Sequence, residues 1–148
     1  MKKWTTACPD WESRIVRGQA LVPVEPIFPE QAEDALDVFC NLRMVDADGS
    51  PLMGDTCRSW VLDVVAALFG AYDADAGRRL ITNYFLMVSK KNGKSTIAAG
   101  IMLTALILNT RPSGEFLILA PTKEAADNAF KPIRDMIDAD EDLQARFH

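Results

Sequence analysis

Apolar residues recur at helical spacing twice in the first half of the chain. One series follows Pro29 and predicts a helix that ends near Met44, because residues 46–51 are dense in Asp, Gly, Ser and Pro. A second series predicts a helix over residues 58–69, with Gly70 as its C-cap. The side chains expected on the two apolar faces are Ala32, Ala35, Leu36, Phe39 and Cys40, and then Trp60, Val61, Val64, Val65, Leu68 and Phe69.

The second half of the chain changes from helical spacing to short apolar runs. Residues 83–88 and 116–120 are two such runs, as expected of parallel strands that are covered on both faces. A polar loop and a long helix over residues 94–108 separate them. Thr122 is expected to cap one more helix, which Pro132 should kink or break. The apolar positions of that helix are Ala126, Phe130, Ile133 and Ile137.

The order strand, loop, helix, strand, helix is a βαβ unit followed by one further helix. Its crossover should be right-handed and its two strands parallel. We therefore predict an α/β chain in two parts, an N-terminal helical lead-in over residues 1–80 and a partial βαβα core over residues 81–148. Two parallel strands make only a partial sheet, because buried parallel strands usually have neighbours on both sides.

Composition fits a soluble globular domain. The chain has 148 residues, of which 49% are hydrophobic and 25% charged. Its formal net charge of −5 argues against a free-standing nucleic-acid clamp, since duplex binding needs clustered Lys and Arg. The longest apolar stretch, residues 97–108, is well short of the roughly 20 residues that cross a bilayer. We therefore expect a reduced, cytosolic protein with no membrane contact.

Residues that bind metals or act as nucleophiles are sparse. The three cysteines form no CxxC pair and the sole histidine is His148, which excludes a zinc finger or a Ser–His or Cys–His nucleophile within the chain. Asp138, Asp140 and Asp142 match the start of a calcium-binding loop. Leu143, however, stands where that loop needs glycine, and no glutamate closes it. Calcium binding is therefore not predicted.

The loop before the long helix carries most of a phosphate-binding motif. A P-loop reads G-x-x-x-x-G-K-[ST] between a strand and a helix, and residues 88–95 read Val-Ser-Lys-Lys-Asn-Gly-Lys-Ser. Gly93 lets the backbone pass close to phosphates, and Lys94 is predicted to reach the β- and γ-phosphates of ATP. The Ser95 hydroxyl is predicted to ligate Mg²⁺. This motif makes the predicted α/β core a three-layer fold of the P-loop NTPase type. The predicted nucleotide-binding residues are Ser89, Lys91, Asn92, Gly93, Lys94, Ser95 and Thr96.

Several stretches resemble the terminase large subunits of tailed bacteriophages. That family carries a loop that lacks the first glycine, often as Arg-Lys-Asn-Gly-Lys-Ser, and residues 86–96 look like that form, with Val88 in place of the glycine. Residues 118–126 resemble the family's second strand and following helix. Trp60 and the Leu-Phe-Gly segment at 68–70 resemble the stretch upstream of the loop, and residues 11–29 resemble the lead-in. The likeness is strongest in the second half of the chain.

The resemblance implies a part in a motor that packages viral DNA. The chain would be the N-terminal part of the ATPase domain, acting in the cytoplasm of the bacterial host. Its implied partners are ATP with Mg²⁺, double-stranded viral DNA, the portal protein and the small terminase subunit, in a homo-oligomeric motor. Lys90 stands where many members have an arginine that senses the γ-phosphate, and it is the candidate catalytic residue. Val61 departs from the family, which commonly has glutamine after the tryptophan.

Such ATPases also need an apolar strand ending in Asp and Glu, to hold Mg²⁺ and activate water. The acidic cluster at residues 138–142 follows no predicted strand, so the chain is expected to stop before that motif and before the family's nuclease domain.

Two alternative functions stay open. One is a non-catalytic nucleotide- or phosphate-binding remnant of a prophage gene. The other is a different P-loop NTPase, such as a helicase or a small-molecule kinase, although a kinase would normally keep the first glycine.

Overall fold

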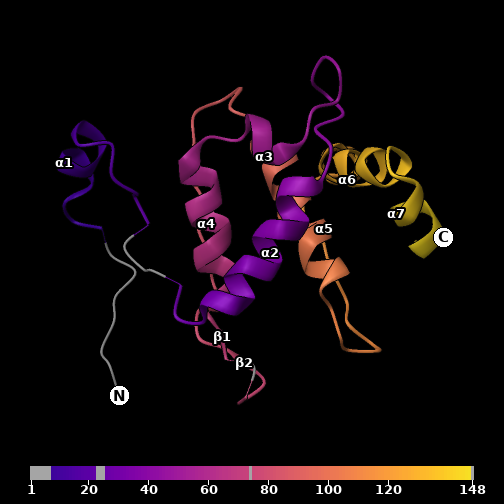
Figure 1. Ribbon diagram of the computed structural model, residues 1–148. Helices are drawn as coiled ribbons and strands as arrows, with labels where there is room; N and C mark the ends of the chain where they lie inside the picture. Colours follow the sequence, from indigo (N-terminus) through magenta and orange to yellow (C-terminus); the bar gives the residue numbers. More distant parts are fainter. Residues whose placement is uncertain (1–7, 23–25, 74, 148) are drawn as a thin grey trace. The chain divides into compact units, whose positions relative to one another are not determined.

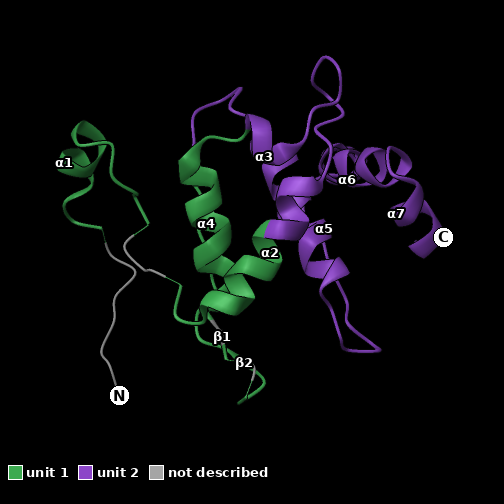
Figure 2. Ribbon diagram, in the orientation of Figure 1, with its two compact units in different colours: residues 1–36, 57–86 green, residues 37–56, 87–148 purple. Residues whose placement is uncertain are grey.

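The computed structural model describes residues 8–22, 26–73 and 75–147, and Figure 1 labels their helices and strands. His148 lies outside these ranges. The chain divides into two compact units that alternate along the sequence (Figure 2). Unit 1 comprises residues 1–36 and 57–86, and unit 2 comprises residues 37–56 and 87–148. The predicted division into a lead-in over 1–80 and a core over 81–148 stays a prediction.

Both helices predicted in the first half are present. Helix α2 spans Pro29–Asn41 and helix α4 spans Ser59–Phe69. Their apolar faces are buried as the spacing indicated, since Ala35 and Phe39 of α2 and Val65 of α4 have no exposed surface. A further short helix, α1 (Trp11–Val16), precedes them and was not predicted.

Gly70 ends α4, but not for the reason expected. A glycine C-cap often adopts the left-handed conformation, whereas Gly70 has φ −67° and is right-handed. The reason for glycine is a close approach: a Cβ on Gly70 would lie 2.7 Å from the Cβ of Pro26. The Gly70 carbonyl also accepts hydrogen bonds from the backbone N–H groups of Ile27 (3.1 Å) and Phe28 (2.9 Å). These bonds hold the chain before α2 against the end of α4.

Unit 2 contains helices α3 (Met53–Thr56), α5 (Lys94–Ile107), α6 (Lys123–Asp138) and α7 (Glu141–Arg146). The helix predicted over residues 94–108 is confirmed as α5. It packs against α6, which in turn contacts α7. None of the helices in the described ranges is long and apolar enough to span a membrane.

Helix α6 begins as predicted but continues further than expected. The Thr122 side chain caps it, because its Oγ1 accepts a hydrogen bond from the backbone N–H of Ala125 at 3.2 Å. Pro132 lies inside the helix, which runs unbroken over 16 residues. Of the two predicted effects of Pro132, the break is therefore wrong, and the kink stays a prediction. Ile133 and Met136, both buried, follow the proline and anchor the second half of the helix in the core of unit 2.

The two predicted parallel strands do not form. Residues 83–88 and 116–120 carry no strand structure, and Phe85 (90% exposed) and Leu119 (89% exposed) are open to solvent. The one sheet in the described part of the chain is a short antiparallel pair, β1 (Tyr72–Asp73) with β2 (Arg78–Arg79). A parallel strand is stable when hydrogen-bonded neighbours and covering layers bury it, and neither run has a neighbouring strand among the described residues. The α/β architecture predicted from the sequence is thus not confirmed by the structure.

Candidate functional site

The loop over residues 89–93 is shaped by two residues in the left-handed conformation. Lys91 has φ +67° and Gly93 has φ +65°, with Asn92 between them. Gly93 is the N-cap of α5, and a Cβ added there would meet no atom within 4 Å. Glycine is therefore favoured at position 93 by backbone conformation rather than by crowding. Lys91 adopts a similar φ without that freedom, which stores strain in the loop.

Two side chains of the loop region converge on one carbonyl oxygen. The Lys94 ammonium donates to the carbonyl of Ser89 at 2.9 Å, and the Asn92 side-chain amide donates to the same oxygen at 3.2 Å. These bonds fold the loop back over the start of α5. They also hold the positive charge of Lys94 beside the loop, where its bond to a neutral carbonyl could be exchanged for a stronger one to an anion.

The first turn of α5 is open to an anion. The backbone N–H of Ile97 donates to the Gly93 carbonyl at 2.9 Å, so the N–H groups of Lys94, Ser95 and Thr96 precede the first intrahelical bond. No acidic residue lies in this turn, whereas Glu124 occupies the first turn of α6. The helix dipole and these unpaired donors favour negative charge at this end.

The structure separates the two hydroxyl residues that follow Lys94. Ser95 is exposed, as a metal or phosphate ligand must be. Thr96 is 4% exposed, and its Oγ1 donates to Oδ2 of Asp46 at 2.8 Å. The predicted use of Thr96 in nucleotide binding therefore does not extend to its hydroxyl in this structure. Asp46 was missed from the sequence, because it lies 50 residues away in a segment that reads only as a turn.

The remaining candidates lie on the surface of the loop. Ser89, Lys90, Lys91 and Asn92 are all exposed, so their backbone and side-chain groups are accessible. The Lys90 side chain makes no hydrogen bond or ion pair with any residue in the described ranges, and its role stays a prediction.

The acidic cluster near the C-terminal end has a structural use. Oδ1 of Asp140 accepts hydrogen bonds from the backbone N–H groups of Asp142 and Leu143, both at 3.0 Å, and so caps α7. Within the residues that the structure describes, no group of three or more His, Cys, Asp or Glu side chains is placed to hold a metal ion.

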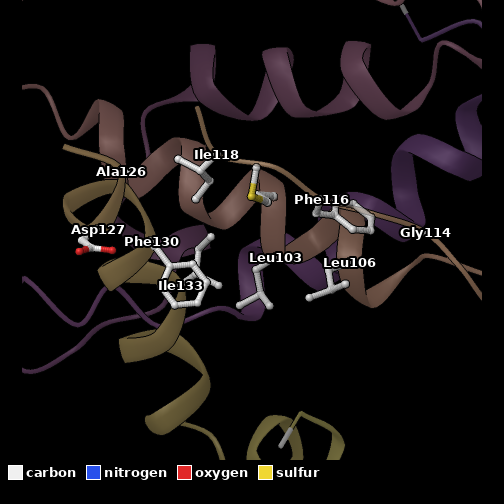
Figure 3. A pocket seen from close by; sticks show the side chains of 10 residues that line it. Leu103, Leu106, Gly114, Phe116, Ile118, Ala126, Asp127, Phe130 and Ile133 are labelled. Atoms are coloured by element: carbon white, nitrogen blue, oxygen red, sulfur yellow. The ribbon is translucent and has the colours of Figure 1, made fainter. Parts of the chain in front are cut away.

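Unit 2 also has an apolar hollow of about 480 Å³ between α5, α6 and the chain before α6. Figure 3 shows Leu103 and Leu106 of α5 on one side of this hollow, with Phe130 and Ile133 of α6 also lining it. Asp127 is the one acidic residue that lines it. No residue of the loop lines it. The hollow is therefore separate from the candidate site.

Comparison with known families identifies the chain. Residues 59–145 match the model of the terminase large subunit ATPase domain. A comparison with curated proteins and a comparison with solved structures each give no match. The matched range covers the whole loop, α5 and α6, and more than half of the chain. The chain therefore belongs to the terminase large subunit family, within its ATPase domain.

Proposed function

We propose that the chain binds Mg²⁺–ATP at residues 89–96 as part of the ATPase that drives viral DNA packaging. The observation that carries this proposal is the family match over residues 59–145, which includes the loop. The geometry is consistent with it, because the loop ends at a helix N-terminus with free N–H donors and a lysine beside it. The family match also supports a P-loop-like fold for the ATPase domain, although residues 83–88 and 116–120 form no strands in the structure.

The residues of the loop have distinct proposed roles. The backbone of Ser89, Lys91, Asn92 and Gly93 surrounds the phosphates, with Gly93 supplying the left-handed turn that starts α5. Lys94 exchanges its bond with the Ser89 carbonyl for the β- and γ-phosphates. The donor set suits the ligand, since it offers N–H groups and one cation to the phosphates.

One side chain of this region, that of Ser95, is suited to ligate Mg²⁺. The exposed Ser95 hydroxyl is a hard oxygen ligand of the type that Mg²⁺ accepts, together with phosphate oxygens and water. Bound Mg²⁺ would neutralise charge on the β- and γ-phosphates. Thr96 contributes its backbone N–H, because its hydroxyl is bonded to Asp46.

The central test is nucleotide binding by Lys94→Ala. The variant should bind Mg²⁺–ATP at least about tenfold more weakly than the parent chain in calorimetry, because a hydrogen bond to a charged group contributes about 1.5–3 kcal/mol. Lys123→Ala is the matched control, since it removes an exposed lysine from α6 and should leave affinity unchanged. Equal binding by the parent chain and Lys94→Ala would refute the proposal.

The magnesium ligand is tested separately. Ser95→Ala should weaken binding of ATP in the presence of Mg²⁺ and leave binding in EDTA nearly unchanged, because only the metal contact is removed. A loss of equal size in both conditions would instead place the Ser95 hydroxyl on a phosphate.

Lys90 is proposed to approach the γ-phosphate during hydrolysis. The test needs the complete motor, in which Lys90→Ala should lower ATP turnover while nucleotide affinity is retained. Arginine fingers contribute about 10³–10⁵ in rate, and a lysine should contribute less because it lacks the guanidinium fork. Lys90→Arg should keep the parent rate. Parent-like turnover by Lys90→Ala would show that Lys90 is a surface residue.

The remaining elements of the proposal come from the family. The partners proposed for the complete motor are double-stranded viral DNA, the portal protein, the small terminase subunit and further copies of the same subunit, in the host cytoplasm. For this chain alone we propose nucleotide binding without turnover, because no strand ending in Asp and Glu follows residues 116–120 within it. If the purified chain hydrolyses ATP and Lys94→Ala abolishes that turnover, the chain contains a catalytic carboxylate.

A further inference from the structure

A hydrogen bond ties the start of α5 to a distant turn of the same unit. Oδ2 of Asp46 accepts from Oγ1 of Thr96 at 2.8 Å. Thr96 follows Ser95 directly and is almost fully buried, whereas Asp46 lies at the surface, as do Asp48 and Gly49 of the same turn. A buried hydroxyl needs a partner, and here the partner is a carboxylate, which makes the stronger, charge-assisted type of bond.

The turn that carries Asp46 is itself held in place. The backbone N–H of Met44 donates to the Pro51 carbonyl at 2.8 Å, and the N–H of Ser50 donates to the Ala47 carbonyl at 3.0 Å. Beyond the turn, the N–H of Met53 donates to the Leu42 carbonyl at 2.8 Å. The carboxylate is therefore presented from a closed, hydrogen-bonded loop rather than from a free end.

Residues 37–56, the segment that includes Asp46, contact α5 a second time, one helical turn after Thr96. A Cβ on Gly100 would lie 2.9 Å from both the Met53 sulfur and the Phe39 ring, so the helix backbone lies directly against these two buried side chains. Residues 37–56 thus contact α5 at two levels, through a polar bond at its first turn and through apolar packing at its middle. Two such contacts fix both the position and the rotation of the helix about its axis.

We propose that Asp46 is a positioning residue for the phosphate-binding end of α5, acting through Thr96. The bond fixes the side chain of Thr96 and joins the first turn of α5 to the turn around Asp46. It thereby holds the free N–H donors of the first turn in one orientation. This inference rests on the proposed binding of Mg²⁺–ATP at residues 89–96.

The test is a double-mutant cycle on Mg²⁺–ATP affinity. Asp46→Ala and Thr96→Val should each weaken binding severalfold, because a smaller fraction of the molecules then holds the first turn of α5 in the binding orientation. The double variant should bind no more weakly than the weaker single one, because both changes break the same contact. Thr96→Ser and Asp46→Asn keep a donor and an acceptor and should retain most of the affinity. Asp48→Ala, an exposed carboxylate of the same turn, is the control and should bind like the parent.

A second measurement examines the chain without nucleotide. Amide hydrogen exchange at Ile97 and Ala98, in the first hydrogen-bonded turn, should be faster in Asp46→Ala than in Asp48→Ala, while exchange in the last turn of α5 stays the same. Unchanged exchange at Ile97, or additive losses of affinity in the double variant, would overturn the positioning role.

The two proposals fail in different ways. If the parent chain binds Mg²⁺–ATP, Lys94→Ala does not, and Asp46→Ala binds like the parent, the positioning role alone is wrong. If the parent chain and Lys94→Ala bind equally, the proposed function is wrong and the positioning role falls with it.

Discussion

Gly100 of α5 lies against Met53, so closely that a Cβ at position 100 would be 2.9 Å from the Met53 sulfur. Gly100→Ala should therefore lower the free energy of unfolding. Met53 and Phe39 are fully buried and have little room to move, so overpacking of about 1–3 kcal/mol should exceed the gain of about 1 kcal/mol in helix propensity. Urea denaturation followed by circular dichroism measures the difference.

Two controls separate packing from propensity at Gly100. Ala98→Gly, at an exposed position of the same helix, should reduce stability by about 1 kcal/mol and gives the propensity term alone. Met53→Ala should remove the contact with Met53 but not the one with the Phe39 ring, so that Gly100→Ala should cost less stability in that background than in the parent chain. If Gly100→Ala stabilises the parent chain, the close packing of α5 on residues 37–56 is disproved.

Substitution by valine should change the stability of the chain in opposite directions at two threonines of α5. Thr104 is fully buried, and its hydroxyl has no hydrogen-bond partner among the described residues. Thr104→Val should raise stability by about 1 kcal/mol, because it removes an unsatisfied buried polar group. Thr96→Val should lower stability by a similar amount, because it removes the hydrogen bond between Thr96 and Asp46. Thermal or urea unfolding of both variants checks the pair, and a loss of stability in Thr104→Val would show that its hydroxyl does find a partner.

The helices could be read from the sequence because each depends on local signals. The apolar face of α2, the start of α5 and the Thr122 cap of α6 were all encoded within one or two turns of chain. The strands predicted at residues 83–88 and 116–120 depend instead on contacts with distant parts of a chain. Their apolar runs indicated burial on both faces, but burial depends on neighbours that no short window of sequence supplies.

The candidate site divides in the same way. Gly93, Lys94 and Ser95 were predicted from a contiguous motif, and the structure places them at the start of α5. Asp46 could not be predicted, because its partner Thr96 is 50 residues away and neither residue belongs to a pattern that links them. The helix was not broken at Pro132, because the buried side chains of Ile133 and Met136 hold its second half in place, and a local propensity rule does not include that packing.

The loop should be sensitive to substitutions that change its left-handed residues. Gly93→Ala should reduce stability by about 1 kcal/mol, since φ +65° is unfavourable for alanine even though its Cβ meets no atom. Lys91→Gly should raise stability by a comparable amount, because it relieves the same strain at φ +67°. The stability of Gly93→Asn should lie between that of Gly93→Ala and that of the parent chain, since asparagine tolerates this conformation better than alanine. Equal stability of Gly93→Ala and the parent chain would indicate that the loop adopts another conformation in solution.

Cys40 should make the stability of the chain depend on pH in the alkaline range. Burial raises the pKa of the Cys40 thiol, and the nearby carboxylates of Asp37 and Asp55 raise it further. In the unfolded chain a thiol loses its proton near its usual pKa of about 8.5, while the folded chain still holds that proton. Above that pH the folded state therefore binds more protons than the unfolded state, and stability falls as pH rises.

Cys40→Ala removes this titration and supplies the comparison. The difference in free energy of unfolding between the parent chain and Cys40→Ala should be constant from pH 6 to about 8 and should then shift against the parent as pH approaches 10. Asp37→Asn should reduce that alkaline shift, because it removes one of the charges that oppose the thiolate. Iodoacetamide should also alkylate Cys40 more slowly in the folded chain than in urea at pH 8, since the thiolate is the reactive form. A difference that stays constant up to pH 10, or that moves in favour of the parent chain, would show that the folded structure does not raise the pKa of this thiol.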